Sequence, residues 1–429
     1  MTSSYRSLFG GFLLCACLSL ASSRPVLAQH PLTLAECKEL ALKQNKRVAA
    51  ATYEVAAAQA AERGAGLAGR PTLDGSLTGL HLGQSLGGPG ALLPTNLLSG
   101  GVTTALPVYT GGKIGTAKAL ARTGVEAQEI QRSLTETDLL LDVERAYWQA
   151  AQVSEKIVLA EKSVAQLQKL QTDLKNEFDA GLIYKNDLLR VDVALNEARL
   201  NVANATDSLT LLRRRLAQLT GSAAPVGLLD PATLAEPPLA PADQPEASRY
   251  EVQLQQKQIE ALEAQKRLFA GDRLPTVALA VSGLTATGKA INVEKQTNGL
   301  ASYYGLLSVS VPIFDWGRRA SRLAEQDARI SAQQAQLRET QEQIGLEILA
   351  ATNALQQATR RIQTAKLSLT QAEENRRLAN DRLAAGTIVA RDVLEAQLIW
   401  QQTYSGLLDA RLDYQLATAV YQKAVGQLR

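Results

Sequence analysis

The chain has 429 residues and a formal net charge of +3, and only 4 % of its residues are aromatic. Its only histidines, His30 and His81, cannot build a histidine-based catalytic triad or a zinc site, and its charge offers no basic surface for nucleic acid. We therefore expect no enzymatic activity, no cofactor, no metal and no nucleic-acid partner.

Residues 1–28 have the features of a secretory signal peptide. Arg6 supplies the positive charge, residues 8–20 the apolar core, and residues 26–28 (Val-Leu-Ala) a small-residue cleavage site. Lipidation at Cys17 is an alternative, because residues 14–17 loosely match a lipobox. Cleavage after Ala28 would leave Cys37 as the only cysteine, so no intrachain disulfide is expected.

Residues 29–221 form the first predicted structural unit. The spacing of apolar residues among many alanines and glutamines predicts a helix over about 32–69. The helix is expected to end there because Pro71 disfavours the helical conformation in the residue before it. Alternating apolar and polar residues then predict strands at about 72–82 and 101–109, around a loop at 83–100. Two proline-free segments predict helices at about 113–180 and 187–220, the second with Asp187 as its N-cap.

The helix at 187–220 carries an apolar stripe with regular three- and four-residue steps, which is typical of a coiled-coil seam. The stripe consists of Leu188, Val191, Leu195, Ala198, Val202, Ala205, Leu209, Leu212, Leu216 and Leu219. The unit is therefore predicted to be a β-hairpin followed by a long α-hairpin with Gly181 at its tip.

The same plan occurs twice in the chain. A shift of 205 positions maps residues 107–113 (PVYTGGK) onto 312–318 (PIFDWGR), and Gly181, Asp187 and Gly221 onto Gly386, Asp392 and Gly426. The second unit, residues 247–429, is expected to contain helices at about 247–270, 317–385 and 391–425, strands at about 275–285 and 303–314, and a loop at about 286–301. Residues 222–246 hold six of the 14 prolines and predict a linker.

The strands are long enough to cross a bilayer when tilted, and each has one apolar face. Tyr109, Phe314 and Trp316 stand at the strand-to-helix junctions, where an interfacial aromatic girdle is expected, with a core position as the alternative. Tyr303 and Tyr304 are expected to anchor the outer rim. Four strands leave open edges unless copies of the chain assemble.

The duplicated plan, the junction sequence at 312–318 and the tip sequences at 180–188 and 385–394 together resemble the TolC-like outer membrane factor (outer membrane efflux protein) family. The resemblance covers about residues 31–426. It implies a mostly α fold with a small β part, assembled as a homotrimer in which a 12-stranded outer-membrane barrel continues into a periplasmic α-helical tunnel. It also implies a location in the outer membrane of a Gram-negative cell, in contact with lipid and extending into the periplasm.

The resemblance further implies that a periplasmic adaptor (membrane fusion) protein docks on the hairpin tips and connects the chain indirectly to an inner-membrane transporter. The tip residues are Gly181, Leu182, Tyr184, Asp187, Gly386, Thr387, Arg391 and Asp392. Asp392 and Glu395 match acidic residues of the family's periplasmic gate, although helix capping by the aspartates and simple solvent exposure of Glu395 are alternatives. Leu383 and Ile388 stand where some members have a polar lock, so packing would hold this entrance closed.

Two functions compete. The first is a passive exit duct in a tripartite efflux or secretion system, for small molecules such as drugs and toxic compounds or for exported protein, as in type I secretion. The alternative is a periplasmic adaptor or structural coiled-coil protein that does not span the membrane. Strands with a lipid-facing apolar side separate the two, because an adaptor needs none.

Overall fold

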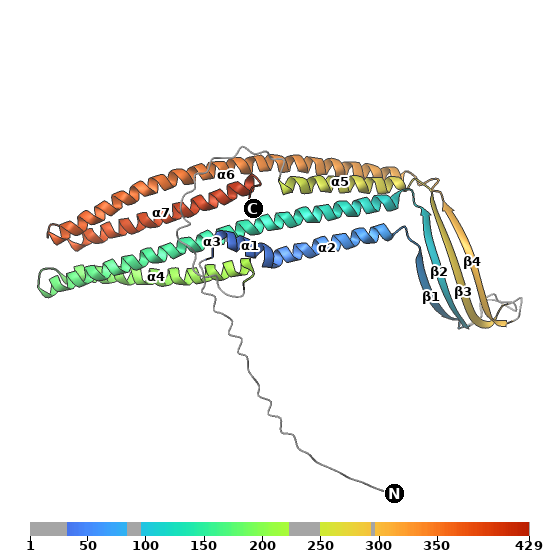
Figure 1. Ribbon diagram of the computed structural model, residues 1–429, viewed down its shortest axis with the longest axis horizontal. Helices are drawn as coiled ribbons and strands as arrows, with labels where there is room; N and C mark the ends of the chain where they lie inside the picture. The colour runs from blue at the N-terminus through green and yellow to red at the C-terminus, as the bar shows by residue number, and fades with distance from the viewer. Residues whose placement is uncertain (1–31, 84–95, 223–248, 293–296, 429) are drawn as a thin grey trace, which may run out of the picture.

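The computed structural model describes residues 32–83, 96–222, 249–292 and 297–428. The expected signal peptide, Cys17, His30 and the linker from residue 223 onward lie outside these ranges. Figure 1 shows a sheet at one end of the molecule and long helices that run from it to two hairpin turns at the opposite end. The fold is therefore mostly helical with a small antiparallel sheet, which confirms the predicted fold class.

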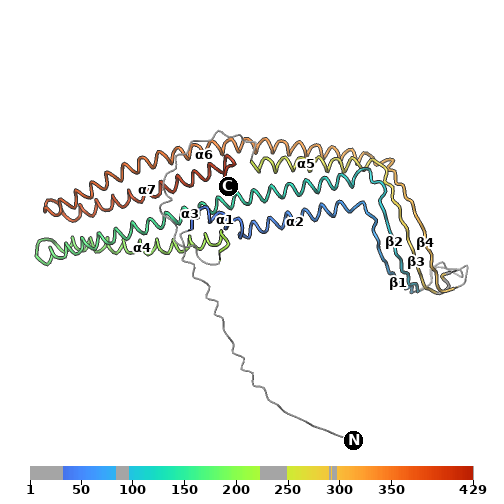
Figure 2. Tube along the Cα trace, in the orientation of Figure 1, coloured from blue at the N-terminus to red at the C-terminus, as the bar shows by residue number. Residues whose placement is uncertain are grey.

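The elements form two successive units that follow the same plan. In chain order they are α1 (Leu34–Gln44), α2 (Lys46–Leu67), β1 (Thr72–His81), β2 (Asn96–Tyr109), α3 (Lys113–Asp179), α4 (Lys185–Thr220), α5 (Tyr250–Gly271), β3 (Thr276–Asn292), β4 (Thr297–Ser310), α6 (Arg318–Ala384) and α7 (Ala390–Ala424). The tube in Figure 2 follows the same path and shows the second unit running alongside the first.

The single helix predicted over 32–69 is wrong, because Asn45 divides it into α1 and α2. Asn45 has an extended backbone, and its Oδ1 accepts a hydrogen bond from the Arg47 amide at 2.7 Å. Its Nδ2 donates to the carbonyl oxygen of Leu219 at 2.7 Å. An N-cap residue inside an otherwise helical stretch thus starts a second helix and ties it to the end of α4.

The four strands form one antiparallel sheet in the order β1-β2-β3-β4. Their register places most of the large apolar side chains on one face, whereas the other face is richer in small and polar residues and also carries leucines such as Leu284 and Leu306. The apolar face includes Leu73, Leu77, Val102, Leu279, Val281, Leu307 and Val309. On the opposite face Thr103 and Ser282 join through their hydroxyl oxygens at 2.9 Å.

The strand ends differ from the sequence prediction. β2 begins at Asn96 rather than 101, β3 extends to Asn292 rather than 285, and β4 runs from Thr297 to Ser310 rather than from 303 to 314. Glycine and polar residues that are typical of loops are held in the strands by backbone pairing, as in the pairing of Gly299 with Thr287. β4 stops early because it is the edge of the sheet: residues 106–109, its counterparts in β2, pair only with β3.

Equivalent helices of the two α-hairpins have closely matched lengths. α3 and α6 have 67 residues each, which corresponds to roughly 100 Å at about 1.5 Å per residue. The predicted seam of α4 is confirmed, since Val191, Leu195 and Leu216 are buried against α3. α7 returns along α6 in the same way.

Polar contacts join the two units along α3 and α7. The carboxylate of Asp409 accepts hydrogen bonds from Gln152 Nε2 and Lys156 Nζ, each at 2.6 Å. Lys423 Nζ donates to Asp138 at 2.5 Å. Among the helices that the structure describes, none combines the length and apolarity needed to cross a membrane.

α2 and α5 are counterparts with different surroundings. A shift of 204 positions maps one onto the other, and α5 packs against both α3 and α6, whereas α2 packs against α3 and touches α1 at its start. In each unit the N-cap residue reaches the last turn of the long hairpin: Arg249 Nη1 donates to the carbonyl oxygen of Ala424 at 3.1 Å, as Asn45 does to Leu219. The second face of α2 is open to solvent.

Candidate functional site

The two hairpin tips have the same backbone geometry. Gly181 and Gly386 lie just beyond the ends of α3 and α6 with φ angles of 76° and 69°. In the first tip the amide of Gly181 donates to Phe178 O and that of Leu182 to Glu177 O, both at 2.9 Å. In the second, Gly386 and Thr387 make the equivalent bonds. Both turns are Schellman motifs, which require a left-handed residue at the glycine position.

The predicted role of the tip aspartates as N-caps is wrong. The N-caps are Tyr184 and Val389, and Asp187 and Asp392 occupy the third position of α4 and α7. Their amides donate to the carbonyl oxygens of the N-caps, each at 3.0 Å. A carboxylate in the first turn still stabilises the helix, because it lies near the positive end of the helix dipole.

Apolar side chains project from the tips. Leu182 and Tyr184 are 75 % and 85 % exposed, and Val389 on the second tip is 56 % exposed. The hydroxyl of Thr387 is turned back to the carbonyl oxygen of Arg382 at 3.0 Å. The first tip therefore presents the larger apolar surface, whereas the hydroxyl of Thr387 on the second tip already has a backbone partner.

The two predicted gate residues have different surroundings. The carboxylate of Asp392 lies 3.7 Å from the guanidinium of the adjacent Arg391. Glu395 is exposed and lines a groove of about 390 Å³ between α4 and α7, together with Arg190, Glu197 and Arg391. Asp392 thus lies near a guanidinium of its own chain, and Glu395 lines a groove whose walls include two arginines.

The positions of the family's polar lock are apolar here and pack together. Leu383 and Ile388 lie against the cluster formed by Ala379, Val393 and Ala396, and Leu170 of α3 packs against the same cluster. Leu170 belongs to the first unit and the others to the second, so this contact joins the two hairpins near their tips.

A pocket of about 620 Å³ lies beside this cluster, between α3, α6 and α7. Three buried atoms of its lining have no hydrogen-bond partner within the described residues: Gln166 Oε1, Arg376 Nε and Gln397 Nε2. Arg376 also stacks over the ring of Trp400 at 4.8 Å. Sequence reasoning missed this pocket, because its residues come from three helices that are distant in sequence.

The aromatic residues expected at the strand-to-helix junctions are all exposed. Tyr109 ends β2, whereas Phe314 and Trp316 follow β4 and contact each other edge to face with 4.9 Å between ring centroids. Asp315 between them shapes the turn, because its carboxylate accepts from the Gly317 and Arg319 amides at 3.2 and 3.0 Å. Trp316 is 90 % exposed and has a φ angle of 57°.

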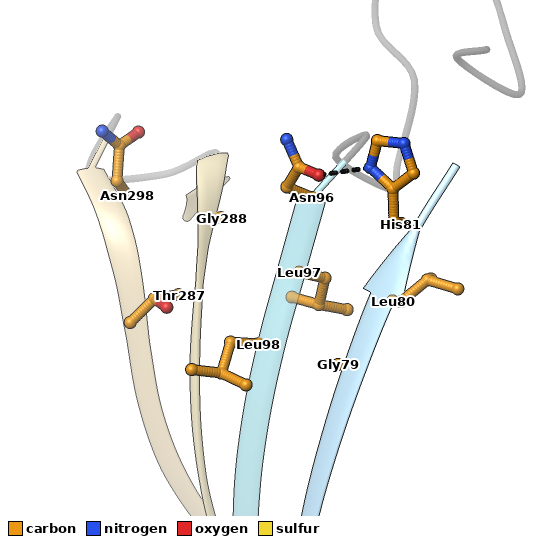
Figure 3. A pocket seen from close by; sticks show the side chains of 9 residues that line it. All are labelled: Gly79, Leu80, His81, Asn96, Leu97, Leu98, Thr287, Gly288 and Asn298. Carbon is orange, nitrogen blue, oxygen red and sulfur yellow. Dashed lines mark hydrogen bonds between the residues drawn. The ribbon is translucent and has the colours of Figure 1, made fainter. Parts of the chain in front are cut away.

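The outer-rim position expected for Tyr303 and Tyr304 is wrong. They lie midway along β4, opposite Gly283 and Ser282, because the strand begins six residues before Tyr303. The far end of the sheet is instead lined by residues shown in Figure 3, where His81 Nδ1 and Asn96 Oδ1 lie 2.6 Å apart. This contact closes the first hairpin at its last paired residues.

The family of the chain follows from its sequence. The model of the family described as outer membrane efflux protein matches residues 38–222 and 243–427, which correspond to the two structural units. The chain therefore belongs to the outer membrane efflux protein family. No curated protein sequence matches the chain.

Solved channel structures share the fold at low sequence identity. A structure of CusC, reported with transmembrane channel formation, has a TM-score of 0.76 at 17 % identity, with 91 % of each chain covered. The CmeC outer membrane channel of Campylobacter jejuni has a TM-score of 0.75 at 16 % identity, covering 92 % of this chain and 85 % of its own. The outer membrane protein VceC of Vibrio cholerae has a TM-score of 0.71 at 18 % identity, covering 92 % of this chain and 96 % of its own. The fold is that of TolC-like channels.

Proposed function

We propose that the chain is the outer-membrane exit duct of a tripartite efflux or secretion system, and that it works as a homotrimer. The sheet carries the main observation. Its apolar face is exposed, with Leu73 and Leu77 about three-quarters accessible, and β1 and β4 are both open edges. Three copies joined edge to edge would close a 12-stranded barrel, remove every edge and turn the apolar face toward lipid.

The helices support the same closure. α5 packs between the long helices α3 and α6 of its own chain, whereas α3 is the only long helix that α2 contacts in the described part of the chain. If α6 of a neighbouring copy packed on the open face of α2, all the short helices would lie between two long ones. Exposed leucines on α4 and α6, such as Leu200 and Leu367, would then also find apolar partners.

The alternative function, an adaptor or structural coiled coil, does not explain the sheet. A soluble protein rarely leaves a contiguous face of leucine and valine uncovered. The β-hairpins of this chain leave their apolar face uncovered, with Val102, Leu307 and Val309 more than half exposed. Lipid accounts for that face.

The tips are proposed to dock a periplasmic adaptor, which would connect the duct to an inner-membrane transporter. Leu182 and Tyr184 are the most exposed apolar side chains there, and aromatic side chains in particular often anchor protein interfaces. We expect Leu182→Asp to abolish efflux-dependent drug resistance while trimer assembly and outer-membrane location stay intact. Lys185→Gln on the same turn serves as the surface control.

The closed entrance is proposed to be held by the apolar contact in which Leu170, Leu383 and Ile388 pack against one cluster of buried residues. Ile388→Asp would place a charge in that contact and shift the equilibrium toward an open entrance. Stacked rings of Asp392 and Glu395 would favour cations in the pore. We therefore expect Ile388→Asp to raise single-channel conductance, and Asp392→Asn with Glu395→Gln to lower cation selectivity.

The decisive experiment is the mass of the chain extracted from outer membranes in detergent, followed by conductance in planar bilayers. A mass of three processed chains and a cation-selective pore are the expected results. A soluble periplasmic monomer or dimer would overturn the proposal in favour of the adaptor-like alternative. Cargo is tested separately, by complementing a channel-deficient strain for drug resistance and for toxin export.

A further inference from the structure

The two strand-to-helix junctions have the same backbone but different residues. Gly111 and Gly112 have φ angles of 64° and 76°, and their counterparts Trp316 and Gly317 have 57° and 82°. Trp316 is the only residue other than glycine with a positive φ angle in the described part of the chain. A tryptophan in the left-handed region is strained, and its surroundings must hold it there.

In the first unit, the turn that follows α5 covers the junction. A Cβ on Gly111 would lie 2.8 Å from the carbonyl oxygen of Gly271 and 2.8 Å from Cβ of Leu274. Lys113 Nζ pairs with Asp272 in the same contact at 2.5 Å. There is therefore no room for a side chain at position 111.

In the second unit, the equivalent place is open in the single chain. Trp316 and Ile313 are 90 % and 92 % exposed. The shift of 204 positions that maps α5 back onto α2 maps Gly271 onto Leu67, the last residue of α2, and Leu274 onto Arg70, in the turn between α2 and β1. In a closed assembly, the turn that reaches Trp316 is the α2–β1 turn of the next copy.

Resting on the proposed closed assembly, we infer that Trp316 packs against the α2–β1 turn of a second copy of this chain, beside Leu67 and Arg70, and not against lipid. Leu67 is half exposed in the single chain and so is free for that contact. The pair of glycine and leucine in the first unit is replaced by tryptophan and arginine, and a guanidinium stacks favourably on an indole ring. Because Trp316 carries the side chain for which Gly111 has no room, the neighbouring turn lies further out and the indole fills the gap.

Two shifts together give the register of the strands that join: 205 positions map β2 onto β4, and 204 positions map β1 onto β3. Thr103 of β2 faces Ser282 of β3, and their counterparts are Ser308 of β4 and Thr78 of β1 in the second copy. Residues 311–314, which directly follow β4, correspond to residues 106–109 of β2, where the pairing is with β3 alone. These residues would complete β4 once the second copy is in place.

Cysteine pairs test the register in the full-length trimer. Ser308→Cys with Thr78→Cys should give disulfide-linked dimers and trimers on oxidation, at least about tenfold more than Ser308→Cys with Ser76→Cys, because facing Cβ atoms in a ladder are near disulfide distance. Cys37 can remain, since it is fully buried and burial raises the pKa of its thiol to about 11. Equal cross-linking by both pairs would overturn the register while leaving the trimer intact.

Tryptophan fluorescence tests the place of the indole. We take the Trp316 contribution as the difference between the native chain and Trp316→Phe in vesicles that contain brominated phosphatidylcholine. An indole packed on a second copy should escape quenching by the bromine atoms, whereas an indole in the lipid interface would be quenched, which would overturn the inference.

Trp316→Gly restores the residue of the first unit and also removes the backbone strain. It should lower the dissociation temperature of the detergent-solubilised trimer by more than about 5 °C, while the helical content of the chain stays unchanged. An unchanged dissociation temperature would overturn the inference. A native chain that proves monomeric in the same assay would instead overturn the proposed function.

Discussion

α2 and α5 are equivalent helices of 22 residues each, but α5 lies between two long helices and α2 rests on one. Their N-cap residues differ in charge. Asn45 caps with a neutral amide, whereas the buried Arg249 pairs with Glu347 of α6 at 3.1 Å. Asp142 of α3 stands at the position equivalent to Glu347, and there it pairs with Arg47 at 2.9 Å. Each unit thus keeps a carboxylate of its own long helix at the start of its short helix, and the comparison teaches that only the second unit uses this carboxylate to pair the N-cap residue.

Arg249→Ala against Asn45→Ala tests this comparison with the largest expected effect. Arg249 is buried and also pairs with Glu251 at 2.6 Å, so its loss leaves a half-buried carboxylate and a carbonyl oxygen without partners. We expect a loss of about 3 kcal/mol in the free energy of unfolding for Arg249→Ala. Asn45→Ala should cost about 1 to 2 kcal/mol. Urea unfolding followed by circular dichroism measures both, and equal losses would contradict the assigned difference.

Gly111→Ala against Gly112→Ala separates crowding from backbone strain at the first junction. Both glycines have positive φ angles, but an alanine methyl group at position 111 would lie 2.8 Å from its nearest neighbours, whereas one at position 112 would meet open space. We expect the free energy of unfolding to fall by about 2 to 3 kcal/mol for Gly111→Ala, where overpacking adds to backbone strain, and by about 1 kcal/mol for Gly112→Ala. Thermal unfolding in detergent checks the order, and equal losses would show that the α5–β3 turn moves away and relieves the crowding.

The tip glycines should behave alike, in contrast to the junctions. Gly181 and Gly386 both have positive φ angles and nothing near an added Cβ. Substitution of either glycine by alanine should lower the free energy of unfolding by about 1 kcal/mol, because alanine is strained in the left-handed conformation. Substitution by asparagine should cost less, because asparagine tolerates this conformation better. Amide hydrogen exchange of the adjacent helix ends would reveal any inequality between the tips.

The smallest expected effect is the dependence of α5 on pH. Burial by itself raises the pKa of Glu251, but the hydrogen bonds and charge of Arg249 outweigh it and hold the pKa below its ordinary value of 4.5. The ion pair therefore stabilises the start of α5 fully above pH 4.5 and loses this effect as the pH falls through the lower folded-state pKa. Amide hydrogen exchange at the start of α5 should therefore become faster in acid. Glu251→Gln should remove this dependence on pH, and exchange in α2, which has no counterpart of the Arg249–Glu251 ion pair, should stay unaffected.

The local pattern of the sequence was enough to predict the long hairpins. The regular stripe from Leu188 to Leu219 predicts which face of the helix packs in the α-hairpin, and the duplicated glycines predict where each hairpin turns. The break at Asn45 was missed because the alanine-rich flanks favour helix on both sides, and only the contact with Leu219 shows the cap in use. The true end of β4 could not be predicted from one chain, because strand pairing depends on a neighbouring strand.

Less of the candidate site was predictable. The tip residues were placed correctly along the chain, but Asp187 and Asp392 occupy the first turn of their helices rather than the cap, because Tyr184 and Val389 already provide the extended residue that begins each helix. The apolar cluster on which both Leu170 and Ile388 pack joins residues far apart in sequence. No pattern within either segment indicates that they meet.

The equal length of α3 and α6 has a consequence for how the chain can change. Both helices begin at the sheet and end at a tip, and each has 67 residues. Deleting seven residues from one helix alone would move its tip by about 10 Å and leave the rim of the duct uneven. Removing one heptad from every arm of both hairpins would keep each seam in register and shorten the duct evenly. The two helices therefore have to keep the same length. The length of the proposed duct can change only by whole heptads that are added to or removed from both units together.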